Sequence, residues 1–119
     1  MNSVLGYART LILGGAYRVQ ALPEFRSEVE RFHATLADLA HLVEATSEWT
    51  NVSPEQLLQG PLSDAMTHAG QLALLRRLAG DPVPPENFVF ARISSDNLGP
   101  EQPLPARPDA EWPERPRTS

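Results

Sequence analysis

The segment from Glu24 to about Thr46 places the strongest constraint on the fold. Its apolar residues recur at intervals of three and four: Phe25, Val29, Phe32, Leu36, Leu39 and Val43. On an α-helix this spacing keeps them within one narrow stripe, about 30 Å long at roughly 1.5 Å per residue. Such a stripe is stable only when another element covers it. The segment therefore predicts a long helix packed within an all-α protein.

A second helical pattern precedes it, from about Ser3 to Gln20. Apolar residues again follow the helical spacing: Val4, Leu5, Ala8, Leu11, Ile12, Ala16 and Val19. Gly14 and Gly15 each weaken this helix by roughly 1 kcal/mol relative to alanine, unless a neighbouring helix must approach closely there. Arg9 and the glycine pair also interrupt the apolar run, so we read this segment as a helix and not as a signal peptide.

The third helical region begins at Ser53. The order Ser53-Pro54-Glu55-Gln56 provides an N-cap serine, a proline at the first helical position and a capping-box glutamine. Gly60-Pro61 is expected to end this short helix and restart the chain. The next helix, Pro61 to Ala79, should end at Gly80, after Arg76 and Arg77 have placed positive charge at the negative end of its dipole.

After Pro82 the composition changes, because nine of the 12 prolines lie from this point onward. We therefore expect a helical bundle domain over residues 1–82 and a loop with a proline-rich, extended tail over 83–119. The stretch Asn87 to Ile93 has enough apolar mass to lie against the bundle. Beyond about Gly99 the tail should be extended and mobile, with Leu104 and Trp112 as its candidate anchors.

Composition and charge exclude several classes of function. Ten Lys plus Arg, all of them arginine, against 15 Asp plus Glu leave a net charge of -5, which disfavours nucleic acid as a partner. The chain has no cysteine, so disulfides, thiolate catalysis and cysteine-bound zinc are excluded, and a metal site must use His, Asp or Glu. No apolar run approaches the length of a membrane span. A soluble, cytoplasmic protein is the expectation.

Asp64 and His68 are the candidate metal ligands. Most of the circumference of the Pro61 to Ala79 helix is apolar, so this helix is expected to lie centrally, with both side chains at least partly buried. They are four residues apart, which places them one turn apart on one face, where both can reach the same Zn or Ni ion. The alternative is a hydrogen-bonded pair that fills the edge of the core.

Two further histidines are candidates for a third ligand. His33 lies on the flank of the Glu24 to Thr46 helix, where it either faces the interior or, as we favour, lies at the rim. His41 falls on the far side of the same helix and should be solvated. No nucleophile elbow, phosphate-binding glycine loop or dinucleotide motif is present, so no catalytic residue is assigned.

The stretch His68-Ala69-Gly70-Gln71, with the Leu-Arg-Arg-Leu-Ala-Gly ending at Gly80, resembles the last helix of DinB-like proteins. The resemblance covers roughly Arg26 to Ile93. It implies a four-helix bundle in which three histidines hold a divalent metal: one from an earlier helix, and two spaced by four on the last. His68 matches the second of the spaced pair, and Asp64 occupies the place of the first. With one helix too few to be read before the last, the resemblance implies a member shortened at its N-terminus.

Two hypotheses follow. The first is a DinB-like, metal-dependent enzyme of the thiol-transferase or hydrolase type with a degenerate or incomplete metal site, in which Asp64 and His68 hold Zn or Ni and His33 is the possible third ligand; its small-molecule substrate is not identified by the sequence. The second is a noncatalytic helical protein that completes its bundle by self-association, as a homodimer, or by binding a partner.

Overall fold

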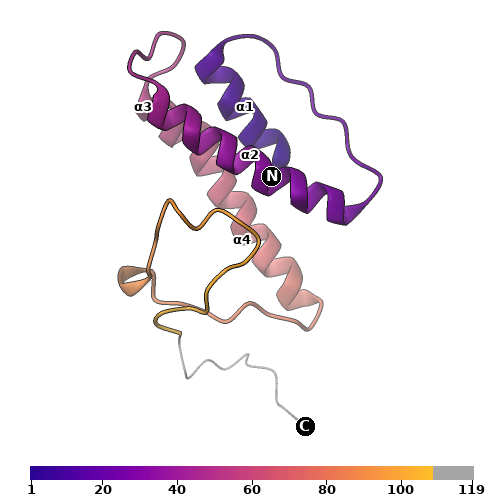
Figure 1. Ribbon diagram of the computed structural model, residues 1–119. Coiled ribbons are helices and arrows are strands. Elements are labelled where there is room, and N and C mark those ends of the chain that lie inside the picture. The colour runs from indigo at the N-terminus through magenta and orange to yellow at the C-terminus, as the bar shows by residue number, and fades with distance from the viewer. Residues whose placement is uncertain (109–119) are drawn as a thin grey trace.

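The structure is a computed structural model that describes residues 1–108, and every regular element in this range is helical (Figure 1). This confirms the all-α class. The elements in chain order are α1 (Asn2–Leu13), α2 (Phe25–Ala45), α3 (Pro54–Leu57), the π-helical turn η1 (Leu58–Leu62), α4 (Ser63–Leu78) and the 3-10 turn η2 (Phe88–Phe90). No helix in this range is both long enough and apolar enough to cross a lipid bilayer.

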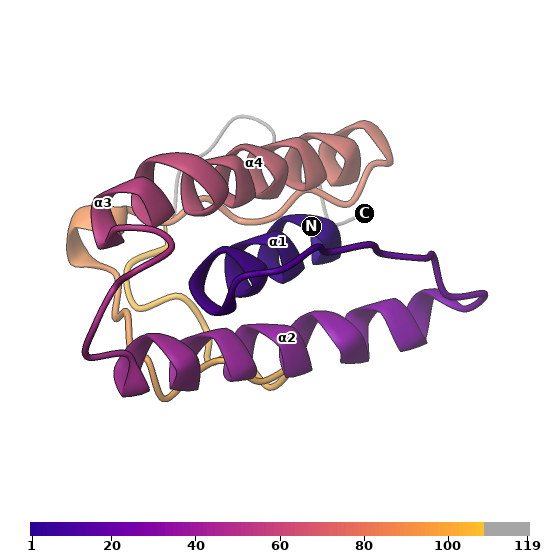
Figure 2. The same cartoon turned by 90° about the horizontal axis from the view of Figure 1, so that it is seen from above.

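The middle of the molecule is α1, which lies between α2 and α4 (Figure 2). Its buried face joins the other two layers in one apolar core, made of Leu5, Ala8, Ile12, Leu39, Val52 and Leu57. The expectation that the Pro61 to Ala79 helix is central is therefore wrong, since none of the residues of α4 is buried. Ala8, which is fully buried, explains the arrangement, because a methyl group at this position lets both neighbouring layers approach α1 closely.

α1 ends at Leu13, with Gly14 as its C-cap, and not at Gln20 as the apolar spacing predicted. Gly14 and Gly15 have φ values of 80° and 114°, in the left-handed region where a right-handed helix cannot continue. The N–H of Gly14 still donates to the carbonyl oxygen of Thr10 at 2.7 Å, and the Asn51 side chain donates to the carbonyl of Ile12 at 3.1 Å. The glycine pair is thus a helix stop, and residues 14–24 form a loop to α2.

Glu28 joins this loop to α1 and α2. Its carboxylate accepts hydrogen bonds from the Leu22 backbone N–H at 2.7 Å and from the Asn2 side chain at 2.6 Å, and forms an ion pair with Arg31 at 2.5 Å. Arg31 in turn donates to the carbonyl oxygen of Gln20 at 2.9 Å. These donors, the Leu22 N–H first, hold the pKa of Glu28 below its usual value, because they stabilise the charged form.

α2 matches its predicted bounds to within one residue at each end. The Ser53 capping box is also confirmed: Ser53 accepts from the Gln56 N–H, and the Gln56 side chain accepts from the Ser53 N–H. At Gly80 the helix ends as predicted, with φ at 82°. The Gly80 and Asp81 N–H groups donate to the carbonyls of Arg77 and Arg76, which is a Schellman motif.

Gly60-Pro61 does not end a helix, contrary to the sequence-based expectation. α3, η1 and α4 follow one another without a break, and the proline lies inside the π turn. Proline has no N–H to donate and its ring crowds the preceding turn, so a wider turn accommodates it where a regular α-turn would not. Pro61 is buried in this position.

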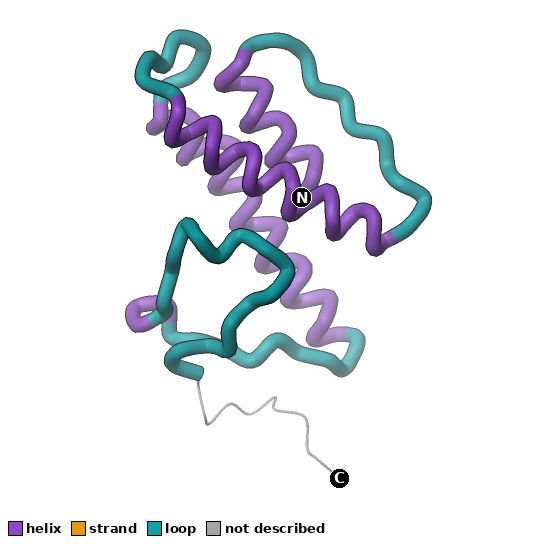
Figure 3. Tube along the Cα trace, in the orientation of Figure 1, coloured by secondary structure: helices purple, strands orange, loops and turns teal. Residues whose placement is uncertain are grey.

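Beyond α4 the chain forms long loops (Figure 3). Phe88, Val89 and Ile93 are exposed, so the prediction that Asn87 to Ile93 packs on the bundle is wrong. The loop is held instead through Leu98, whose carbonyl oxygen lies 2.8 Å from Nδ1 of His33, and through an Asn87–Arg107 backbone hydrogen bond. Of the two candidate anchors, Leu104 is exposed and Trp112 lies outside the described residues.

Candidate functional site

His68 is held in a defined orientation on α4. Its Nδ1 lies 2.9 Å from Oε1 of Gln71, one turn further along the helix. An amide oxygen can only accept a hydrogen bond, so Nδ1 carries the hydrogen and donates it. In the neutral imidazole the lone pair is then on Nε2, the nitrogen that remains available as a ligand or a base.

Asp64 lies beside this free nitrogen. Its Oδ1 is 3.6 Å from Nε2 of His68, which is longer than a normal hydrogen bond. Two ligand atoms that each lie about 2.1 Å from a tetrahedral ion are about 3.4 Å apart, so the observed separation is close to that of two neighbouring metal ligands. The spacing of four residues thus brings the two side chains together as predicted.

The two side chains are less buried than expected. The His68 side chain is 39% exposed and that of Asp64 is 56% exposed. His68 is therefore half-buried, as predicted, but Asp64 is largely open to water. This follows from the position of α4, which is an outer helix and not the central one.

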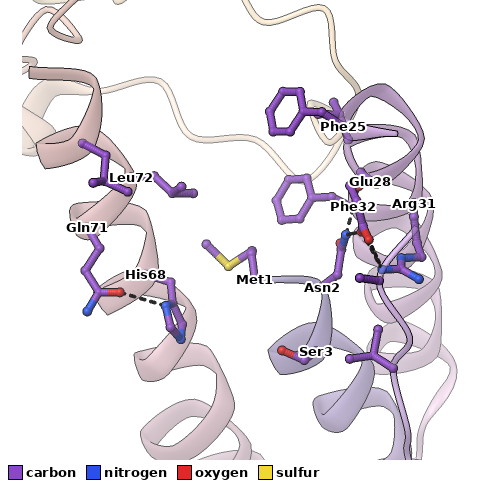
Figure 4. Close-up of a pocket in the computed structure, with 14 residues that line it drawn as sticks. Met1, Asn2, Ser3, Phe25, Glu28, Arg31, Phe32, His68, Gln71 and Leu72 are labelled. Atoms are coloured by element: carbon purple, nitrogen blue, oxygen red, sulfur yellow. Dashed lines mark hydrogen bonds and ion pairs between the residues drawn. The ribbon is translucent and has the colours of Figure 1, made fainter. Parts of the chain in front are cut away.

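His68 faces a groove of about 530 Å³ between α4, the first half of α2 and the start of α1 (Figure 4). Apolar side chains form most of its walls: Met1, Val19, Ala21, Phe25, Val29, Phe32, Leu72 and Leu75. The polar groups at the groove are Asn2, Ser3, Glu28, Arg31, His68 and Gln71. Asp64 does not line this groove; it lines a separate hollow next to α1, formed with Tyr7 and Pro61 among others, and reaches the groove only through its contact with His68. An apolar groove with a few polar groups is the usual form of a small-molecule site.

Among the described residues, no third metal ligand is brought to this pair. Within residues 1–108, no three His, Cys, Asp or Glu side chains lie close enough together to hold an ion. His33 is half-buried at the rim of α2, where it binds the Leu98 carbonyl and packs edge-on against Phe32 with ring centroids 5.1 Å apart. His41 is exposed, as predicted.

Sequence reasoning missed Glu28, Arg31 and Asn2 as polar groups of the groove. The spacing of Glu28 and Arg31 on α2 indicates an ion pair, and this much could have been predicted. Their placement at the groove depends on Asn2, which lies 26 residues from Glu28 in the chain. A contact between residues so far apart in the chain cannot be predicted from local sequence patterns.

Comparison with protein-family models, with curated proteins and with solved structures finds no match to this chain.

Proposed function

We propose that this is a DinB-like helical protein in which Asp64 and His68 bind a divalent metal ion, Zn or Ni, at the edge of a groove that accepts a small molecule. The observation that carries the proposal is the 3.6 Å separation of Oδ1 and Nε2, with the other ring nitrogen already occupied by Gln71. A ligand histidine in a metal site usually donates its second N–H in this way, which fixes its tautomer and orientation. The proposal also retains the finer features of the fold that the resemblance implies: a DinB-like four-helix bundle, followed by an extended proline-rich tail.

The groove supports a reaction of the thiol-transferase or hydrolase type. The aromatic rings of Phe25 and Phe32 and the side chain of Leu72 would pack on the apolar part of a substrate and displace water from it. Glu28 and Arg31 would contact a polar end, on the opposite wall from His68 (Figure 4). When bound, the ion would lower the pKa of a water or a thiol.

Titration of metal-free protein with Zn²⁺ and Ni²⁺ by calorimetry tests the proposal. We expect binding tighter than about 100 μM, which corresponds to roughly 5.5 kcal/mol. His68→Ala should abolish this binding and Asp64→Asn should weaken it, because each removes one of the two donors. His41→Ala is the matched control, since it removes an exposed imidazole from a different helix and should bind metal as the unmodified protein does.

Absence of binding at this level would refute the metal function. Equal binding by the His68→Ala variant would place the ion elsewhere in the protein and remove the role assigned to this pair.

A second function is favoured by the exposed apolar surface of α4. Leu72, Leu75 and Leu78 are all more than half exposed, which is unusual for three leucines on one helix. A noncatalytic protein that binds a helical partner, or a second copy, through α4 would cover them. Sedimentation of metal-free protein tests this alternative: association at micromolar concentration supports it, and a stable monomer contradicts it.

A further inference from the structure

The Asp64–His68 pair supplies too few ligands for a stable metal site. Structural zinc sites use four protein ligands and catalytic sites use three. Two donors are present here, and no further His, Cys, Asp or Glu joins them within the described range 1–108. Further ligands have to come from groups other than these two side chains.

We propose that a second copy of the chain completes the site, so that one divalent ion is bound by Asp64 and His68 of both copies on a two-fold axis. This inference rests on the proposed metal function and extends it. A two-fold interface uses the same surface patch on each copy, so a pair of donors becomes a set of four. Two imidazole nitrogens and two carboxylate oxygens are suitable ligands for tetrahedral zinc.

Both donors are accessible to a second copy. The side chain of Asp64 is 56% exposed and that of His68 is 39% exposed. Leu72 and Leu75 follow His68 at intervals of four and three residues, so they lie on the same side of α4 as the two donors. Figure 4 shows His68, Gln71 and Leu72 along one wall of the groove, with Phe25 and Phe32 on the other. A second copy that reaches the donors would also cover these apolar side chains.

The size of the apolar surface indicates that the ion is needed for association. Four apolar side chains on α4 and on the facing wall of the groove are exposed: Phe25 (84% exposed), Leu72 (54%), Leu75 (60%) and Leu78 (75%). Because these side chains are already partly covered, burying what remains exposed would remove at most about 300 Å² of apolar surface from water. A standard interface buries about 800 Å² on each partner. Apolar contact alone would therefore give a weak dimer.

The negative charge of the chain makes dimerisation depend still more strongly on the bound divalent ion. Each chain has a net charge of -5, and a two-fold contact at this site brings two Asp64 carboxylates together. Without an ion these like charges repel each other. A divalent cation balances the two negative charges and is bound by the same groups, so metal binding and dimerisation should be linked by mass action.

Sedimentation velocity, with and without Zn²⁺, tests the inference on the full chain, and calorimetry gives the number of ions per chain. We expect a monomer in EDTA and a doubling of mass with Zn²⁺, at one ion for two chains. His68→Ala and Asp64→Asn should remain monomeric with Zn²⁺. Leu75→Glu should also block the dimer, because it places a charge in the interface while both donors remain.

The matched control for Leu75→Glu is Leu104→Glu, which adds the same charge at an exposed leucine of the tail and should dimerise normally. Binding of one Zn²⁺ per chain with no change in mass would overturn the shared site and leave the metal function intact. Absence of Zn²⁺ binding would overturn both. A zinc-dependent dimer of the His68→Ala variant would show that other residues hold the two copies together, which also overturns the shared site.

Discussion

Replacing Leu5 with alanine should destabilise the protein much more than replacing Leu75, because α1 and not α4 is the central helix. Leu5 is 3% exposed and Leu75 is 60% exposed. Loss of a fully buried leucine costs about 2 to 5 kcal/mol, through lost burial and the cavity that is left. Leu75 is only about two-fifths buried, so its loss should cost about 1 kcal/mol at the usual value for leucine burial.

Urea unfolding followed by far-ultraviolet circular dichroism measures both costs. A difference of 3 kcal/mol moves the midpoint by roughly 1 to 3 M at typical slopes. The experiment is done in EDTA, so that no metal-linked dimer covers Leu75. Equal costs for the two variants would refute the layer order described above, since they would mean that Leu75 is as well covered as Leu5.

Two further predictions concern the polar links and the turns. The pKa of Glu28 is lowered in the folded protein, so the contribution of Glu28 to stability is fully present above the ordinary pKa of 4.5 and is lost as pH falls through the lower folded pKa. The difference in Tm between the unmodified protein and Glu28→Gln should therefore shrink from pH 7 to pH 3. A difference in Tm that stays constant over this range would contradict the prediction. Gly14→Ala should destabilise the protein by about 1 to 2 kcal/mol, because φ is 80° at this position. Gly70→Ala should instead stabilise it by about 0.5 to 1 kcal/mol, because Gly70 lies inside α4 with open space around its Cβ position. Urea unfolding measures both effects, and effects of the same sign would be inconsistent with these backbone conformations.

The helix boundaries that could be predicted are those set by local chemistry. The capping box at Ser53 and the glycine stop at Gly80 involve residues within five positions of one another, so the sequence displays them directly. The order of the layers could not be predicted in this way. α4 is apolar around most of its circumference, which suggested a central position, but apolar composition does not identify the partner that covers a helix. α1 took that position, with Ala8 fully buried on its inner face.

In the candidate site, too, the local features could be predicted from the sequence and the long-range contacts could not. Asp64, His68 and Gln71 lie within two turns of one helix, and their placement on one face followed from the helical period. The opposite wall of the groove depends on the contact between Asn2 and Glu28, which joins two helices. The exposure of Asp64 was also unpredicted; it depends on the turn that precedes α4 as well as on the outer position of this helix.

That turn sets the direction in which Asp64 points. In an unbroken α-helix Asp64, seven residues after the buried Leu57, would share its face and point into the core. A π turn holds one more residue than an α turn, and one added residue rotates the following helix by about 100°. With η1 in place, Ala65 packs against the core in the position that Asp64 would have taken, and Asp64 moves to the edge. The π turn around Pro61 thus accounts for the outward position of the Asp64 carboxylate, and His68, four residues further along the same helix, turns with it and stays beside it.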